Sequence, residues 1–273
     1  MTNSKIKLIC SDIDHTLLDA SMGSIPQRNI DAVRKAVDSG VAFVLNSGRS
    51  YDSMKHYGDI LKLPEDSYIV TLGGSLIFRG ASIVDSHVID RNIALEISLK
   101  ALEMGLFVHS FCKREWCSSS IDPWFDSEKR ACMTDGQLFN PTDYFKDHDP
   151  HKLLVLTDDQ DLMKKFGESL ASFSNDITTS FSFQYGMEIN PAGISKGTAI
   201  ATLCSLMGIR QGEVLSVGDF YNDIEMFKVS GYSAALGEAP DDVKKVAGTV
   251  VASCREGGLA EAIEKFVLQP SVQ

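Results

Sequence analysis

Short apolar runs alternate with helical patterns along the first third of the chain. We predict buried strands over Ile6–Cys10, Val41–Leu45 and Tyr68–Leu72. A helix ending near Leu61 fits between the second and third runs, after a polar turn at residues 46–49. This strand–helix order predicts a parallel sheet, because parallel neighbours need helical crossovers.

The first helix has several start and stop signals. Ser24 and Gln27 have the spacing of a capping box, and Pro26 stands in the first turn. Gly40 supplies the stop. Three apolar residues keep helical spacing in between, namely Ile30, Val33 and Val37.

The same alternation returns near the C-terminus. We predict a strand over Val214–Val217, a helix that begins near Asn222, and further alternation as far as Phe266. The helix before that strand carries an apolar face made of Ile200, Leu203, Cys204 and Met207.

Residues 82–190 separate the two halves and carry two strand–helix–strand patterns. Their helices are predicted over Ile93–Met104 and Leu162–Phe173. The runs Leu153–Leu156 and Phe181–Ile189 alternate more, as half-buried strands of an open sheet do. We therefore predict an α/β fold in which residues 1–81 and 191–273 form a doubly wound, Rossmann-like parallel sheet and residues 82–190 form a smaller inserted α/β domain.

Composition narrows the range of partners. The 273 residues are 44% hydrophobic and carry a net charge of −11, so a general nucleic-acid binder is not expected. An anionic substrate would need a metal cation or a local basic cluster to offset this field. The apolar run Ile6–Cys10 is too short for a signal peptide or a membrane span, so we expect a soluble, cytoplasmic protein without a membrane partner, as a monomer or small homo-oligomer.

The six cysteines include no CxxC pair, and we interpret them as reduced thiols. A zinc site is an alternative, although its spacings match no standard zinc motif. Its ligands would be Cys112, Cys117, Cys132 and His109.

Two carboxylates follow the first strand directly. Asp12 and Asp14 lie two residues apart, so in extended chain both face the same side at the strand's carboxyl end. Ligands bind at that edge in open α/β sheets. The alternative is a pair that only caps a turn or a helix.

A second acidic cluster follows the strand Val214–Val217. Asp219, Asn222 and Asp223 offer oxygen ligands, which together with Asp12 suit a hard cation such as Mg²⁺. Capping of the next helix by Asp219 or Asn222 is the alternative.

Phosphate-binding groups are predicted at two further element ends. Ser47 and Gly48 follow the second strand and offer a hydroxyl and exposed backbone N–H groups. Lys196 stands at the start of a helix, where its charge and the helix N-terminus both favour an anion. A solvent-exposed side chain is the ordinary alternative for a lysine.

Taken in order, these residues resemble the phosphatases of the haloacid dehalogenase superfamily. Asp12, Asp14 and Thr16 match the family's DxDxT, and Ser47 and Lys196 match its second and third motifs. Residues 218–223 match its GDxxND. Residues 188–197 and 256–259 look like the Cof-type subgroup, in which an α/β cap lies between the second and third motifs, where residues 82–190 lie here.

The resemblance implies a role for each matched position. Asp12 is expected to be the nucleophile and Asp14 the general acid and base. The carboxylate of Asp12, the backbone carbonyl of Asp14 and the carboxylate of Asp219 are expected to bind Mg²⁺, supported by Asn222 and Asp223. Ser47, Gly48 and Lys196 are expected to hold the phosphoryl group.

Three positions depart from the family pattern. His15 stands where Gly is usual, Leu72 where Asn is common, and Glu238 where an Asn-Ala pair usually begins. In the insertion, the residues that could contact a leaving group or equally form the core of the cap are Trp116, Trp124, Phe125 and Arg130.

We therefore expect a Mg²⁺-dependent phosphomonoester hydrolase that acts on sugar phosphates or similar small phosphorylated metabolites through an aspartyl phosphate. A sugar phosphomutase of the same fold and a non-catalytic, phosphometabolite-binding regulator are the alternatives.

Overall fold

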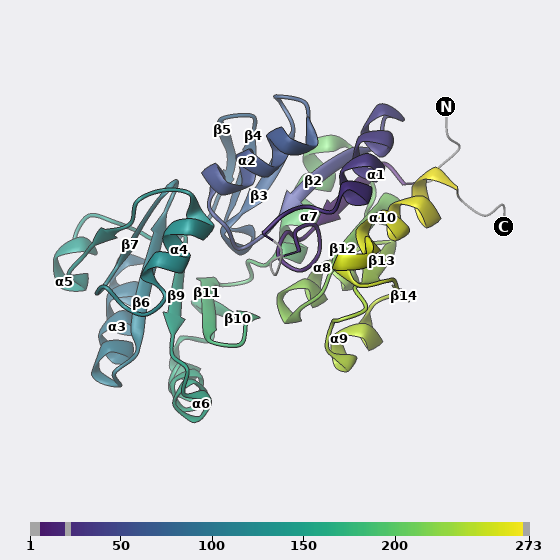
Figure 1. The fold of residues 1–273 in the computed structure, drawn as a ribbon. Helices are drawn as coiled ribbons and strands as arrows, with labels where there is room; N and C mark the ends of the chain where they lie inside the picture. The colour runs from purple at the N-terminus through teal and green to yellow at the C-terminus, as the bar shows by residue number, and fades with distance from the viewer. Residues whose placement is uncertain (1–5, 20–22, 270–273) are drawn as a thin grey trace.

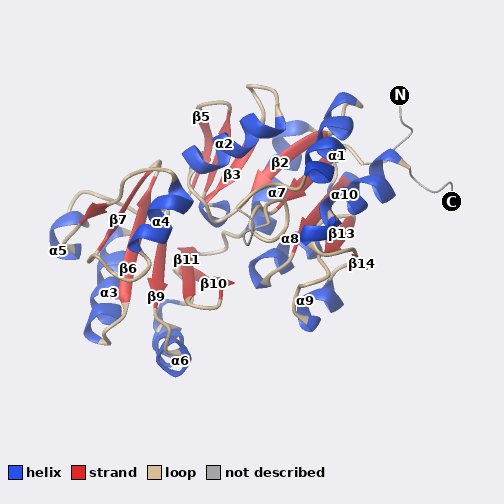
Figure 2. Ribbon diagram, viewed as in Figure 1, coloured by secondary structure: helices blue, strands red, loops and turns tan. Residues whose placement is uncertain are grey.

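The computed structural model describes residues 6–19 and 23–269, which form two sheets with their helices (Figures 1 and 2). Residues 1–5, 20–22 and 270–273, which the predicted large domain includes, lie outside the described residues. In the described ranges, no helix combines the length and the apolar character needed to cross a bilayer.

The large sheet has eight strands in the order β14-β13-β12-β1-β2-β3-β4-β5. All neighbours from β14 to β3 pair in parallel, whereas β4 and β5 add an antiparallel edge. The strands are β1 (Leu8–Ser11), β2 (Ala42–Asn46), β3 (Tyr68–Thr71), β4 (Leu76–Arg79), β5 (Ser82–Ser86), β12 (Val214–Gly218), β13 (Tyr232–Ala235) and β14 (Thr249–Val250).

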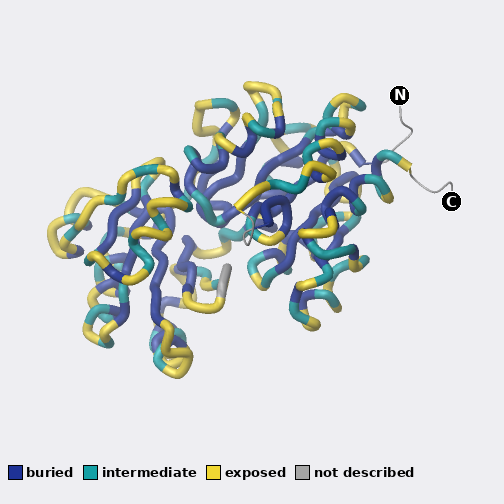
Figure 3. Tube along the Cα trace, in the orientation of Figure 1, coloured by how far each residue is buried: buried dark blue, intermediate teal, exposed yellow. Residues whose placement is uncertain are grey.

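Helices cover both faces of this sheet. Leu8 and Cys10 of β1 pack with α7, α8 and α9, whereas Ile9 between them packs with α1, α2 and α10. Burial on both sides explains why the central strands are continuous apolar runs, dark blue in Figure 3, and it confirms the doubly wound fold. The helices are α1 (Gln27–Asp38), α2 (Tyr51–Leu61), α7 (Lys196–Met207), α8 (Ile224–Val229), α9 (Asp241–Val246) and α10 (Gly258–Ile263).

The residues between β5 and α7, which we call the cap, form a six-stranded sheet in the order β10-β11-β9-β6-β7-β8. Its strands are β6 (Phe107–Cys112), β7 (Glu115–Ser118), β8 (Gln137–Leu138), β9 (Lys152–Leu156), β10 (Ile177–Phe183) and β11 (Gly186–Pro191). Helices α3 (Arg91–Glu103) and α6 (Gln160–Ser169) share a core with this sheet. The shorter helices are α4 (Phe125–Cys132) and α5 (Pro141–Tyr144).

Two boundaries differ from the sequence-based expectation. The insertion was expected to begin at residue 82, but β5 pairs with β4 in the large sheet, so the chain leaves that sheet only after Ser86. The run Phe181–Ile189 is not one strand, because a turn at Gln184 and Tyr185 divides it into the β10–β11 hairpin.

Two local expectations were wrong as well. Ser24 does not cap α1: the cap position is Pro26, and no side chain bonds to the helix start. Strand β9 is not half-exposed but buried at every position. Its alternate residues Leu153 and Val155 pack in the cap core, while Leu154 and Leu156 face a cavity that the cap shares with the large sheet.

His151 lies where the cap joins the large sheet. Its Nδ1 accepts the backbone N–H of Lys113 at 3.2 Å, so Nε2 carries the proton of the neutral ring and donates to Ser86 Oγ at 3.1 Å. Burial, together with the nearby charges of Lys113 and His87, lowers the pKa of His151 to about 4.

We expect His151 to make the protein less stable as the pH falls from 7 to 5. In this window the unfolded chain takes up a proton on His151 and the folded protein does not, so the free energy of unfolding should drop by about 2 kcal/mol from this residue. Urea unfolding of wild type and His151→Gln at both pH values measures the difference. Equal losses in the two proteins would show that the ring does not stay neutral when folded.

Candidate active site

A cavity of about 450 Å³ lies at the carboxyl ends of β1 and β12, closed on the other side by the cap. The chain order reverses between these two strands, with β2 and β3 on one side and β13 and β14 on the other, and ligands bind at such switch points. From the large sheet, the sequence-predicted residues that line it are Asp12, Asp14, Ser47, Gly48, Asp219 and Asn222.

Asp12 follows β1 directly and is buried, with 6% of its surface exposed. Its Oδ1 accepts the backbone N–H of Ile13 at 2.7 Å and lies 2.9 Å from Lys196 Nζ. Lys196 is the first residue of α7 and is not solvent-exposed, since only 2% of it is accessible. Its ammonium also binds Asp223 Oδ1 at 2.7 Å, so one buried cation joins two carboxylates beneath the cavity.

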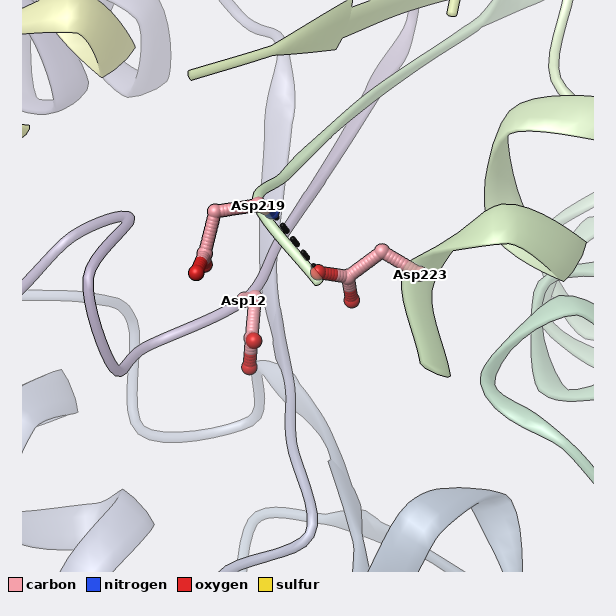
Figure 4. A group of neighbouring side chains, drawn as sticks. All are labelled: Asp12, Asp219 and Asp223. Atoms are coloured by element: carbon pink, nitrogen blue, oxygen red, sulfur yellow. Dashed lines mark hydrogen bonds between the residues drawn. The ribbon is translucent and has the colours of Figure 1, made fainter. Parts of the chain in front are cut away.

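Asp219 and Asp223, in the turn after β12, have different hydrogen-bond partners. Asp219 Oδ1 accepts the hydroxyl of Thr16 at 2.7 Å. Asp223 Oδ2 accepts the backbone N–H groups of Asp219 and Phe220 at 2.8 and 3.0 Å, so it fixes the turn and both its oxygens are used. Carboxylate oxygens of Asp12, Asp219 and Asp223 nevertheless lie within 4.8 Å of one another. Figure 4 shows these three side chains.

Burial, together with the neighbouring carboxylates, raises the pKa of Asp12 and of Asp219. Burial and the charges of Asp223 and Asp14 raise the pKa of Asp12 to about 7, although Lys196 acts in the opposite direction. Burial, with Asp223 and Asp12, also raises the pKa of Asp219. The single positive charge of Lys196 does not balance the three carboxylates of Asp12, Asp219 and Asp223. A further cation would therefore bind favourably among them.

Asp14 is held by an arginine that we did not include among the predicted site residues. Arg49 donates to both oxygens of Asp14, at 2.7 and 2.8 Å. Burial opposes ionisation, but the hydrogen bonds and charge of Arg49 prevail and lower the pKa of Asp14 below its usual range. The sequence signal for Arg49 was its place directly after Ser47 and Gly48.

Ser47 and Gly48 form a tight loop after β2. The backbone N–H of Ser47 donates to Val70, and its hydroxyl oxygen lies 3.4 Å from the backbone nitrogen of Arg49. A Cβ on Gly48 would stand 2.2 Å from Glu188 Oε1, so a side chain here would displace that carboxylate, and glycine allows the close approach of the cap. Asn222 lies across the cavity, and its buried Oδ1 has no hydrogen-bond partner.

The cap contributes lining residues that were not among the predicted site residues, although Glu188 lies in the segment that resembles the Cof-type subgroup. They include Lys152, Leu154, Leu156 and Glu188. Of its four candidate leaving-group contacts, Trp124 lines the cavity, whereas Trp116 is buried against Phe125. Arg130 lines a different, shallow pocket.

The departures from the family pattern have structural explanations. His15 lies at the cavity with φ of 55°, and Leu72 has φ of 52°, a region where Gly or Asn is accommodated best, which explains the usual residues there. Leu72 is buried and outside the cavity lining. Glu238 accepts the backbone N–H of Cys254 at 2.9 Å, so it holds a neighbouring loop.

The alternative zinc site does not form. All six cysteines are free, as expected, and His109 is instead paired with Asp122 at 2.7 Å. Within residues 6–19 and 23–269, the group of Asp12, Asp219 and Asp223 is the one cluster of potential metal ligands.

This chain is similar to known hydrolases in sequence and in fold. A family model described as haloacid dehalogenase-like hydrolase matches residues 9–263. Two Bacillus subtilis (strain 168) enzymes named 5-amino-6-(5-phospho-D-ribitylamino)uracil phosphatase, YcsE and YwtE, are 27% and 26% identical and align with 96% of this chain and with 96% and 98% of their own lengths. The crystal structure of a haloacid dehalogenase-like hydrolase from Bacteroides thetaiotaomicron is 26% identical, with a TM-score of 0.83 over 95% of this chain and 98% of that one.

Proposed function

From the premise that this chain belongs to the haloacid dehalogenase-like hydrolase family and is a phosphatase, we propose that it hydrolyses small phosphomonoesters through a phosphorylated Asp12. The observation that carries the proposal is the position of Asp12. Asp12 lies at the carboxyl end of β1 and lines the cavity. Its carboxylate is paired with Lys196 and lies beside Asp219. A carboxylate so placed can attack phosphorus once the charge on the phosphate is neutralised.

Asp12 would attack the phosphorus atom while Lys196 and the loop at Ser47 and Gly48 hold the phosphate oxygens. The bond between phosphorus and the leaving oxygen then breaks, and Asp14 supplies the proton which that oxygen needs. Because Arg49 keeps Asp14 ionised in this state, Asp14 has to separate from Arg49 before it can act as an acid. The ionised form is the one required in the second half, when Asp14 removes a proton from the water that attacks the aspartyl phosphate.

The acidic cluster fits Mg²⁺, which prefers oxygen ligands and usually takes few from the protein. We propose the carboxylates of Asp12 and Asp219 and the backbone carbonyl of Asp14 as ligands. Asp223 would orient the turn, and the unpaired Oδ1 of Asn222 would accept a hydrogen bond from the ion's hydration shell. When bound, the ion supplies charge neutralisation for the phosphoryl group.

We propose sugar phosphates and related small phosphorylated metabolites as the substrates. We also propose that the protein acts in the cytoplasm. A cavity of about 450 Å³ accommodates a leaving group of this size under the cap. The relatives from Bacillus subtilis are named for a phosphorylated ribityl chain joined to a pyrimidine, so that compound belongs among the candidates. Polar Gln184 beside apolar Leu154 and Leu156 suits a hydroxylated leaving group that also carries an apolar surface.

A panel of phosphorylated metabolites tests the substrate class. We expect inorganic phosphate to be released from several sugar and sugar-alcohol phosphates, including the ribitylaminouracil phosphate. Isomerised sugar phosphate without release would instead identify a phosphomutase, and binding without turnover a regulator. Activity confined to phosphoproteins or nucleic-acid ends would contradict the proposal.

A further inference from the structure

We propose that Lys152, fixed by Glu188, is a positioning residue that docks the cap on the phosphate-binding loop and orients the Ser47 hydroxyl towards the phosphoryl group. This inference rests on the proposed function, because it assigns a task to the cap within the same site.

Lys152 and Glu188 form an ion pair in the cavity wall, each 3% exposed. Their Nζ and Oε1 atoms lie 3.0 Å apart, on neighbouring strands β9 and β11. The same ammonium donates to the backbone carbonyl of Gly48 at 2.7 Å, a contact between residues 104 positions apart in the sequence. A side chain of the cap thus reaches the loop that follows β2.

The contact at Gly48 affects Ser47 through one peptide bond. In a planar trans peptide, the carbonyl of one residue and the N–H of the next point in opposite directions. With its carbonyl held by Lys152 on one side, the Gly48–Arg49 peptide presents the Arg49 N–H to Ser47 Oγ on the other, at 3.4 Å. A hydroxyl whose oxygen accepts that bond has its own proton free to donate to a phosphate oxygen.

The lack of a side chain at Gly48 allows this ion pair to approach the loop. A Cβ at Gly48 would stand 2.2 Å from Glu188 Oε1, so any larger residue would displace the carboxylate that holds Lys152. A side chain on this loop residue would therefore compete for space with the ion pair of the cap.

Stability alone is a poor explanation of the pair. Buried ion pairs often contribute no more than apolar residues of the same volume, because desolvation offsets their attraction. Nor does the position of the cap depend on Lys152 alone, since three other contacts join the cap to residues 49–52. They are Arg49 with the Ala131 carbonyl, Ser50 with the Cys132 carbonyl, and Arg114 with Asp52.

The test replaces both members of the pair, Lys152→Met with Glu188→Gln, so that no uncompensated charge stays buried. We expect kcat/KM for a sugar phosphate to fall at least tenfold, inorganic phosphate to bind at least fivefold more weakly by calorimetry, and the melting temperature to change little. Arg114→Met with Asp52→Asn is the matched control: it removes an ion pair between the cap and helix α2 and should leave all three values unchanged.

A double-mutant cycle separates positioning of Ser47 from a general effect of the cap. In a Ser47→Ala background, replacing the pair should cost less than twofold, because its target is gone. Gly48→Ala, which keeps the backbone groups but displaces Glu188, should reproduce the loss. An equal tenfold loss with and without Ser47, or no loss at all, would overturn the inference. If wild type itself releases no phosphate, the proposed function has failed, and the phosphate-binding measurements alone then decide the role of the pair.

Discussion

Replacing Asp12 with Asn should abolish phosphorylation of the protein, whereas replacing Asp14 with Asn should trap it. The Asp12 variant lacks the attacking carboxylate, so no label from a phosphorylated substrate should become covalently bound. The Asp14 variant keeps the nucleophile and the backbone carbonyl proposed as a metal ligand. It loses proton transfer, which typically slows turnover by about a hundredfold to ten-thousandfold.

The two variants differ most with an aryl phosphate, whose leaving group needs little protonation. The Asp14 variant should still phosphorylate Asp12, but water attack then lacks its base, so the acyl phosphate should accumulate. Acid quenching and mass spectrometry of the intact protein measure it directly. Asp176→Asn, an exposed carboxylate of the cap, is the control and should turn over like wild type. Identical behaviour of the Asp12 and Asp14 variants would show that nucleophile and acid/base are wrongly assigned.

Removing divalent cations with excess chelator should lower phosphate release by three orders of magnitude or more, and added Mg²⁺ should restore it. Without the ion, the excess of buried carboxylates faces an anionic substrate with Lys196 as the buried cation. A readout independent of activity is thermal unfolding. An ion present at a hundred times its dissociation constant stabilises the folded state by about 2.7 kcal/mol, so Mg²⁺ should raise the melting temperature.

Asp219→Asn provides the matched variant for this measurement, because it removes charge without changing shape. Its melting temperature should respond much less to Mg²⁺, and its activity should require far higher Mg²⁺ concentrations. Full activity of wild type in chelator would contradict the metal proposal. A wild-type melting temperature that does not respond to Mg²⁺ would contradict the binding site itself.

Much of the fold could be predicted because its signals are local. Buried parallel strands must be apolar on both faces, so β1, β2, β3 and β12 stand out as short apolar runs. The outer strand of the antiparallel edge, β5, was missed because it is mostly exposed and carries no such run. The β10–β11 turn was missed because Gln184 and Tyr185 are not typical turn residues.

The sequence by itself determined which carboxylates and which lysine stand at strand and helix ends, since those positions follow from the chain's own periodicity. It could not determine how each is paired. Only the tertiary structure brings Arg49 to Asp14, Lys196 to both Asp12 and Asp223, and Lys152 to Gly48. These pairs join residues 27 to 184 positions apart. The strand order of the large sheet brings the pairs of Arg49 and Lys196 together, and the packing of the cap on that sheet brings Lys152 to Gly48, which no local pattern encodes.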